Sequence, residues 1–241
     1  MKILPPHLFL ASALLAGLAA AERPAVTVSL FNGHNLEGWT TYAQNAAPAA
    51  ADTWTVGDGV IRCSGQPHGY LRTTGRYRDY RLTVEWRWVP GPAPVDAQGK
   101  PRSRNSGVLL HMQAPDTIWP RSLEAQLMET NAGDFYAIGG VETAQLATAR
   151  EQALAAATDD ASRTRARNTR RVPRQSATSE KPLGEWNRYE ITCRGDQVTV
   201  VVNGVTQNTA TSVSVSEGHI CLQSEGAPIE FRNVKLAPLP E

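Results

Sequence analysis

The residues with the most potential for chemistry lie close together, between positions 104 and 140. A histidine, His111, follows a run of apolar residues. Two carboxylic acids and an amide follow as Glu124, Gln126 and Glu129. Carboxyl groups on one surface can act as acid and base or as nucleophile and acid, and an imidazole can act as a base near neutral pH. We therefore take His111, Glu124 and Glu129 as candidate catalytic residues.

Other polar and aromatic residues of the region could bind a substrate. Trp119 lies in a proline-containing loop, where its ring could stack on the apolar face of a sugar. Arginine side chains could stabilise an oxyanion. The alternative is that these are ordinary solvent-facing residues. The candidate substrate-binding residues are Arg87, Arg104, Asn105, Trp119, Arg121, Gln126, Asn131 and Asp134.

A metal site is a weaker hypothesis. Glutamate, aspartate and histidine would suit a divalent cation, but the sequence has no compact ligand spacing and no C-x-x-C pair. His111 could equally be a ligand, a base or a structural residue. The identity of a cofactor stays open, with a divalent cation as the candidate.

Strands must position these side chains, because short β-prone runs separated by turn residues dominate the chain. Asn203-Gly204 after an apolar run is a strong signal for a hairpin with positive φ at both turn residues. The predicted strands are 26–30, 54–56, 60–63, 80–89, 106–112, 123–128, 186–193, 197–202, 219–223 and 229–236.

Alternation within these strands predicts which side chains leave the core. In strand 80–89, Leu82, Val84 and Trp86 share one face, and strand 123–128 alternates in the same way. If strands 80–89, 106–112 and 123–128 are neighbours, their polar faces form one surface. Glu129 joins it only if a one-residue bulge lies near Met128. That surface would carry Glu85, Arg87, His111, Glu124 and Gln126.

The domain organisation is simple. Lys2, an apolar run and Ala19–Ala21 resemble a secretory signal covering residues 1–21, which predicts a periplasmic or extracellular protein without a membrane span after cleavage. Residues 22–241 form one all-β sandwich. Residues 142–182 are rich in alanine and arginine and form a helix-bearing, partly mobile insertion, with a helix over 144–157. It could be a lid, a contact for an acidic partner, or a solvated loop.

Charge and cysteine content narrow the function further. The formal net charge of +1 gives no basic field, so nucleic acid is not expected as a partner. Cys63, Cys193 and Cys221 are an odd number, so at least one thiol stays free. Either all three are buried thiols, or Cys193 and Cys221 form a bridge.

Several short motifs, taken in order, resemble the 3-keto-disaccharide hydrolase domain family. The likeness covers about residues 29–239, with the insertion as the poorly matched part. The motifs are Leu30-Phe31-Asn32-Gly33 through Gly38-Trp39, Trp54-x-Val56-x-Asp58-Gly59-Val60-Ile61, Asn105-Ser106-Gly107-Val108, Glu124-Ala125-Gln126, Asn131-Ala132-Gly133-Asp134-Phe135, Gly184-Glu185-Trp186-Asn187, Val202-Asn203-Gly204, Gln223-Ser224-Glu225-Gly226 and Glu230-Phe231-Arg232-Asn233-Val234.

The resemblance implies a concanavalin-like jelly-roll sandwich and a carbohydrate substrate. It implies cleavage of 3-keto-glycosides by removal of the C2 proton, elimination and hydration. On that reading His111 is the base, and Arg104, Arg87 or a metal held by Glu124 and Glu129 stabilises the oxyanion. The strand from Glu124 to Glu129 is also similar to the bulged Glu-x-Asp-x-x-Glu strand of family 16 β-glucanases. Gln126 replaces the middle acid, which argues against the retaining glucanase mechanism.

Two other classes of function fit the same residues. A non-catalytic carbohydrate-binding module could use the acids and Trp119 for hydroxyl contacts and stacking, because this fold serves lectins as well as enzymes. A structural or adhesive surface domain would use the arginine-rich insertion as its contact surface. The cluster around Glu124 favours an enzyme over the third class.

Overall fold

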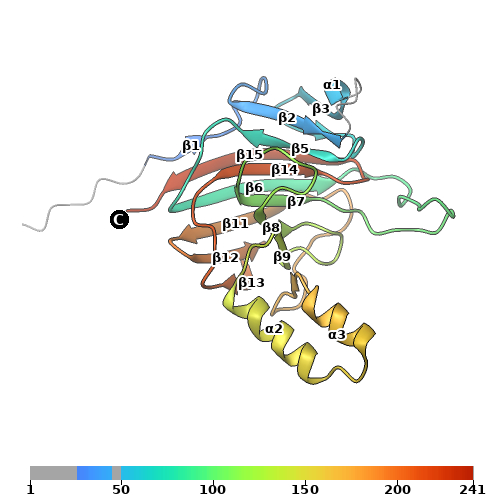
Figure 1. The fold of residues 1–241 in the computed structure, drawn as a ribbon. Helices are drawn as coiled ribbons and strands as arrows, with labels where there is room; N and C mark the ends of the chain where they lie inside the picture. Colours follow the sequence, from blue (N-terminus) through green and yellow to red (C-terminus); the bar gives the residue numbers. More distant parts are fainter. Residues whose placement is uncertain (1–25, 45–49, 241) are drawn as a thin grey trace, which may run out of the picture.

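The structure is a computed structural model that describes residues 26–44 and 50–240. Two antiparallel sheets pack face to face as a jelly-roll-like sandwich (Figure 1). The predicted secretory signal, residues 1–21, lies outside the described residues. Within the described ranges, none of the helices is both long enough and apolar enough to cross a bilayer.

The first sheet has eight strands and forms one layer of the sandwich. The short strand β1 (Val28–Ser29) pairs with β15 near one end. In spatial order the other strands are β13 (Val205–Ala210), β12 (Gln197–Val202), β11 (Asn187–Arg194), β6 (Tyr80–Trp88), β15 (Ile229–Pro238), β4 (Val60–Cys63) and β3 (Trp54–Gly57).

The second sheet has seven strands and carries most of the candidate residues. The helix α1 (Ala50–Thr53) lies between β2 and β3 in the chain. In spatial order the strands are β10 (Arg171–Val172), β9 (Phe135–Ile138), β8 (Ser122–Gln126), β7 (Gly107–Met112), β14 (His219–Ser224), β5 (Gly69–Thr73) and β2 (Trp39–Ala43).

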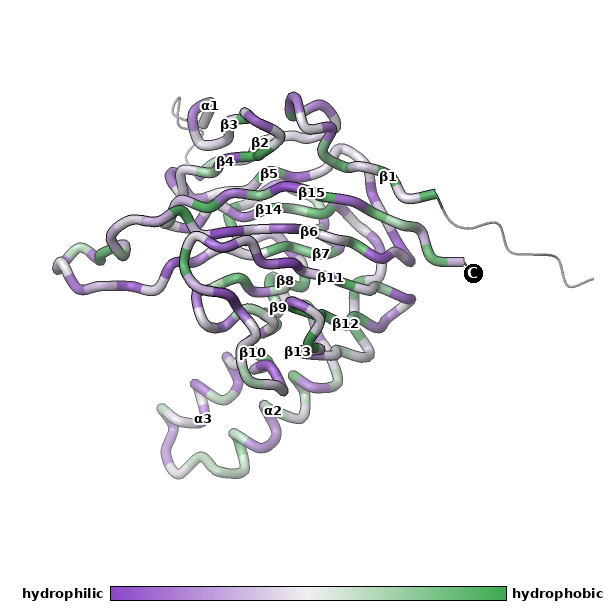
Figure 2. The backbone as a smooth tube through the Cα atoms, turned by 180° about the vertical axis from the view of Figure 1, so that it is seen from behind, coloured by the Kyte–Doolittle hydropathy of each residue, from purple (hydrophilic) through white to green (hydrophobic). Residues whose placement is uncertain are grey.

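The core between the sheets follows the predicted alternation. In β6, Leu82, Val84 and Trp86 are fully buried, and the Trp86 ring packs on Tyr189 of β11 at 5.2 Å between centroids. Hydrophilic and hydrophobic residues are interspersed along the strands (Figure 2). At Asn203-Gly204 the φ values are 49° and 83°, which confirms the hairpin between β12 and β13.

The expectation that strands 80–89 and 106–112 share a sheet is wrong. They are consecutive along the chain, but β6 belongs to the eight-stranded sheet and β7 to the seven-stranded sheet. The polar face of β6 therefore lies on one outer surface of the sandwich, and the polar face of β7 lies on the opposite outer surface. Glu85 and Arg87 lie on the outer face of the eight-stranded sheet, away from Glu124.

A bulge in β7 reverses the expected direction of His111. The register shifts so that two residues of β7, Leu110 and His111, lie opposite the single residue Ile220 of β14. His111 adopts φ 53°, and its buried imidazole packs edge-on against Tyr80 at 5.6 Å. Its Nδ1 lies 3.1 Å from the Val215 carbonyl oxygen. The predicted surface position of His111 is therefore wrong.

The insertion folds as two helices and an edge strand. Helix α2 (Ala144–Ala155) begins at Thr143, whose side chain accepts a hydrogen bond from the Leu146 amide, and α3 (Asp160–Arg167) begins with a capping box at Asp159. The helices lie beside β9 and β13 (Figure 1). The chain then returns as β10, which pairs with β9.

All three cysteines are free and buried. The alternative of a Cys193–Cys221 bridge is therefore wrong. Cys193 lies in β11 and Cys221 in β14, so the two thiols belong to different sheets. Burial raises the pKa of Cys193 to about 12, which keeps that thiol protonated.

The buried imidazole gives a pH-dependent stability that can be measured. Burial lowers the pKa of His111 below its usual value, so the unfolded chain binds the proton more readily than the folded chain. Below about pH 6.5 we expect wild type to lose stability relative to His111→Gln, by at most about 1.4 kcal/mol per pH unit. Chemical denaturation of both proteins between about pH 7.5 and 5.5 measures this difference. A constant difference across that range would contradict a buried neutral imidazole.

Candidate active site

The candidate site lies on the outer face of the seven-stranded sheet, on the side away from the core. Residues that are directly paired across strands point to the same face. Leu109 of β7 pairs with Glu124 of β8, and Glu124 pairs with Tyr136 of β9. Tyr136 in turn pairs with Arg171 of β10. A continuous row of side chains thus crosses four strands, with Glu124 near its centre.

Glu124 is a buried acid without a charge partner. Its side chain has 5% exposure, and Oε1 has no hydrogen-bond partner among the described residues. Burial raises its pKa well above the usual value, and the nearby Glu225 carboxylate adds to the effect. Burial therefore favours the protonated form of Glu124, which can donate a proton or a hydrogen bond.

Gly107 makes the space that Glu124 occupies. The two residues are paired across β7 and β8, and a methyl group at Gly107 would collide with Oε1 of Glu124. Any larger residue would have to displace the carboxyl group. The glycine of the Asn105-Ser106-Gly107-Val108 motif is thus needed for the position of an acid 17 residues later in the chain.

Glu225 is the second acid of the site. It follows β14 and is held by isolated bridges between Asn105 and residues Glu225 and Gly226. Burial raises the pKa of Glu225 to about 7, and the Asn105 side chain opposes this rise. Glu225 is therefore partly ionised at neutral pH, whereas burial favours the protonated form of Glu124. Two acids with separated pKa values are the usual arrangement for an acid and a base.

A cleft opens beside both acids. One part has a volume of about 230 Å³, and an adjoining part of about 560 Å³ shares Asn105, Met128 and Glu225. The first part is lined by Asn105, Trp119, Glu124, Gln126, Met128, Tyr136, Ala137, Ile138, Arg170 and Glu225. The second part adds Gln66, His68, Pro94, Val95, Asp96, Arg102, Ser103 and Gly226.

Aromatic side chains supply apolar surface around the acids. Trp119 has 43% exposure and lines the cleft together with Tyr136. On the same sheet, Tyr42 and Tyr70 are stacked at 5.0 Å between ring centroids, and they pack with Leu109 in a separate apolar cluster. Such rings can stack on the C–H faces of a sugar.

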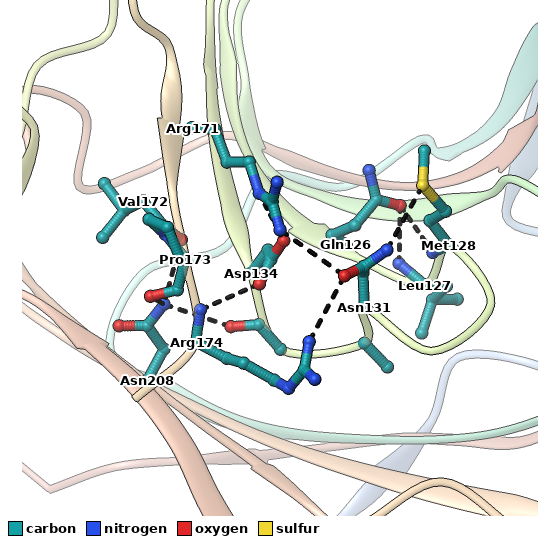
Figure 3. Close-up of polar contacts among 12 residues, drawn as sticks. Gln126, Leu127, Met128, Asn131, Asp134, Arg171, Val172, Pro173, Arg174 and Asn208 are labelled. Carbon is teal, nitrogen blue, oxygen red and sulfur yellow. Dashed lines mark hydrogen bonds and ion pairs between the residues drawn. The ribbon is translucent and has the colours of Figure 1, made fainter. Parts of the chain in front are cut away.

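Four of the predicted site residues line this cleft: Asn105, Trp119, Glu124 and Gln126. Gln126 also shapes the backbone. Its Oε1 accepts hydrogen bonds from the amides of Leu127 and Met128 at 2.8 and 2.7 Å (Figure 3). This contact ends β8 and is compatible with Met128 lining the cleft.

Glu129 does not join Glu124, because no bulge returns it to that face. Its carboxylate pairs with the Arg104 guanidinium at 3.0 Å, and Arg104 also donates to the Gly91 carbonyl at 2.6 Å. The pair holds the loop before β7 against the end of β8. The predicted catalytic role of Glu129, the substrate role of Arg104 and a cation shared by Glu124 and Glu129 are therefore not supported by the structure.

Two other arginines are also structural. Arg87 lies on the outer face of the other sheet, where it pairs with Glu230 at 2.6 Å and covers the Trp186 ring at 4.7 Å. Arg121 donates to the carbonyl of Gly140 at 3.0 Å and to the Ser214 hydroxyl at 3.2 Å. Neither residue lines the cleft, so their predicted substrate contacts are wrong.

Asn131 and Asp134 anchor the insertion instead of a substrate. The buried Asp134 carboxylate pairs with Arg171 at 2.7 Å and accepts the Arg174 amide at 2.8 Å (Figure 3). Asn131 accepts weaker hydrogen bonds from both guanidinium groups at 3.4 and 3.3 Å. Neither residue lines the cleft, so the structure does not place them with the predicted substrate contacts.

Metal ligands are sparse in the described part of the chain, which contains no cluster of three or more histidine, cysteine, aspartate or glutamate side chains suited to a metal ion. Side-chain oxygen atoms among the residues that line the cleft include those of Asn105, Glu124 and Glu225. Asn105 Oδ1 and Glu124 Oε1 both lack partners among the described residues. Both atoms are buried, so neither is open to solvent in this structure.

Residues that line the cleft but were not predicted from the sequence include Met128, Arg170 and Glu225. Arg170 lies in the insertion, for which the sequence left a lid, a contact for an acidic partner and a solvated loop as alternatives. The Gln223-Ser224-Glu225-Gly226 motif carried a signal for Glu225, but nothing local shows that it meets Asn105. His68 lines the second part of the cleft.

Solved structures with the same fold include several carbohydrate-active proteins. A protein from Parabacteroides distasonis assigned as a glycosyl hydrolase is 18% identical, with TM-score 0.56 over 89% of this chain and 94% of that one. The β-glucanase of Bacillus licheniformis is 11% identical, with TM-score 0.54 over 91% and 100%. A carbohydrate-binding module from Bacillus subtilis is 11% identical, with TM-score 0.52 over 82% and 94%. At these identities the likeness shows the concanavalin-like fold alone.

Family membership rests on the sequence itself. Among curated proteins, none matches the chain. The model of one domain family, described as 3-keto-alpha-glucoside-1,2-lyase-like, matches residues 26–237, which is nearly all of the described chain. The chain therefore belongs to the family of 3-keto-alpha-glucoside-1,2-lyase-like domains, a glycosyl-hydrolase-like family of carbohydrate-active proteins.

Proposed function

We propose that this protein cleaves the glycosidic bond of 3-keto-glycosides by elimination followed by hydration. The observation that carries the proposal is the pair of acids in one cleft, Glu124 and Glu225, whose pKa values are raised to different extents. Elimination needs one group that takes a proton and another that gives one. Glu225, with a pKa of about 7, is suited to take the proton, and Glu124, whose pKa is raised further by burial, is suited to give one.

The chemistry starts at the C2 hydrogen, which the C3 ketone makes acidic. The ionised Glu225 carboxylate takes this proton, and the electron pair of the C2–H bond moves onto the C3 oxygen as an enolate. The enolate then reforms the ketone, a C1–C2 double bond forms, and the bond from C1 to the glycosidic oxygen breaks. Protonated Glu124 gives its proton to the departing oxygen. Water adds at C1 and a proton returns to C2, so the net reaction is hydrolysis.

Neutral groups of the cleft would stabilise the enolate. The amide groups of Asn105 and Gln126 line the cleft and carry N–H donors. Donors that are already in place when charge develops lower the barrier without reorganisation. In this mechanism the two amides stabilise the oxyanion in place of Arg87 and Arg104. Trp119 and Tyr136 would hold the sugar ring through its apolar face.

A carbohydrate-binding module is the alternative function, and the aromatic surfaces of Trp119 and Tyr136 would serve it equally well. Burying two acids without a cationic partner is costly for a protein that only binds a neutral sugar. The burial of both acids is explained if they act as an acid and a base, which favours an enzyme over a binding module.

Single-atom changes at the two acids separate catalysis from binding. We expect Glu124→Gln and Glu225→Gln each to lower turnover by about 10²- to 10⁴-fold, because each removes one proton-transfer group. Sugar binding should persist in both variants, since the amide keeps the shape of the side chain. The measurement is release of a chromogenic leaving group from a 3-keto-glucoside, with binding followed by calorimetry.

Glu151→Gln, an exposed change on α2, is the matched control and should leave turnover unchanged. An unoxidised glucoside tests whether the ketone is required. Wild-type protein that binds both sugars and cleaves neither would overturn the proposal and support a binding module. Full activity in Glu225→Gln would remove Glu225 as the base.

The pH profile tests the same assignment in the unmodified protein. A base works when it is ionised, so kcat/KM should rise about tenfold per pH unit below the Glu225 pKa of about 7 and level off above it. An acid works when it is protonated, so activity should fall again only at the raised pKa of Glu124. A profile that is flat from about pH 5 to 8 would contradict the pair.

A further inference from the structure

The insertion builds a second, cationic cleft beside the first. Its volume is about 430 Å³, and it lies between the end of β9 and the two helices of the insertion. None of the residues that line it is acidic. They are Ala137, Gly140, Val141, Arg150, Arg167, Asn168 and Arg170.

Two of the three arginines are free to bind a ligand. Arg150 is occupied, because its guanidinium pairs with Glu142 at 2.6 Å and donates to the Thr169 carbonyl at 2.9 Å. Among the described residues, the guanidinium groups of Arg167 and Arg170 have neither a hydrogen-bond partner nor an ion-pair partner. Each presents a fork of N–H donors suited to an oxyanion.

The position of Arg170 is fixed by the strand that follows it. Its carbonyl oxygen accepts a hydrogen bond from the Ala137 amide at 2.9 Å. The next residue, Arg171, is tied to the buried carboxylate of Asp134. The backbone at Arg170 is thus held at the edge of the sheet, which limits where its guanidinium can reach.

The cationic cleft adjoins the cleft that holds the two acids. Ala137 and Arg170 line both. Asn105 and Glu225 line both the 230 Å³ part and the 560 Å³ part of the acid-lined cleft. Arg170 lines the 230 Å³ part and also the cationic cleft. A ligand that spans the junction therefore meets acids on one side and free guanidinium groups on the other.

We propose that the cationic cleft binds an oxyanion, a carboxylate or a phosphate, carried by the sugar or leaving group of the substrate. This names the substrate class of the proposed function and rests on it. Repulsion by Glu225 and attraction by Arg167 and Arg170 would orient such a ligand, with its anionic group away from the acid that takes the proton. The arginine-rich insertion is then a part of the substrate site.

Binding of simple sugars to the full chain tests the proposal without any turnover. The probes are glucose, glucuronate, glucose 6-phosphate and inorganic phosphate, titrated by calorimetry at low and high salt. We expect at least one of the two anionic sugars to bind roughly tenfold more tightly than glucose, with the preference reduced by salt. Comparison of glucuronate with glucose 6-phosphate distinguishes a carboxylate from a phosphate.

The decisive variants are Arg170→Ala and the double variant Arg167→Ala/Arg170→Ala. Both should lower the affinity for the anionic sugar to that for glucose and leave glucose binding unchanged. Arg165→Ala removes an equal charge from α3 outside the cleft and should keep the preference. Because Arg167 and Arg170 are exposed, thermal unfolding should be nearly unchanged in the variants.

Three results would overturn the proposal: equal affinity for neutral and anionic sugars, equal loss in Arg165→Ala and Arg170→Ala, or inorganic phosphate binding as tightly as glucose 6-phosphate. The outcome is separable from the proposed function. Failure to cleave 3-keto-glucosides would leave a measured anion preference intact. A missing preference would leave cleavage of neutral 3-keto-glucosides intact.

Discussion

The candidate site depends on one buried carboxyl group, that of Glu124. It stays in the sheet because Gly107 on the neighbouring strand leaves space for it, and its Oε1 finds no partner among the described residues. A buried acid without a cation is stable only in the protonated form, so its position in the fold also sets its charge. Glu225 lies close enough to raise the Glu124 pKa further and is itself less strongly shifted. The division into acid and base therefore follows from burial.

Most charged residues near the site hold the frame around these acids. Arg104 with Glu129 fixes the ends of two strands, and Asp134 with Arg171 fixes the return of the insertion. Partly buried pairs of this kind satisfy one another, so they have little capacity left for a ligand. The Arg170 guanidinium, which is exposed and has no such partner among the described residues, remains free to bind a ligand.

The insertion adds to the sheet as well as to the surface. By pairing β10 with β9, it covers the strand edge that would otherwise be exposed and places Arg170 at the cleft. The capped helices α2 and α3 supply the wall opposite β9. A segment that matches the family motifs poorly thus contributes residues to the site region.

The sequence by itself determined the features that depend on local order. Alternation identified the core face of β6 and the outward direction of Glu124 and Gln126, Asn203-Gly204 identified a hairpin, and the ordered motifs identified the sandwich. Tertiary structure alone decided which strands share a sheet. It separated Arg87 from Glu124, turned His111 inward through a bulge opposite Ile220, and brought Glu225 to Asn105 from 120 positions away in the chain. The physical reason is that alternation is set within one strand, whereas sheet partners, bulges and the burial that shifts a pKa depend on residues far apart in sequence.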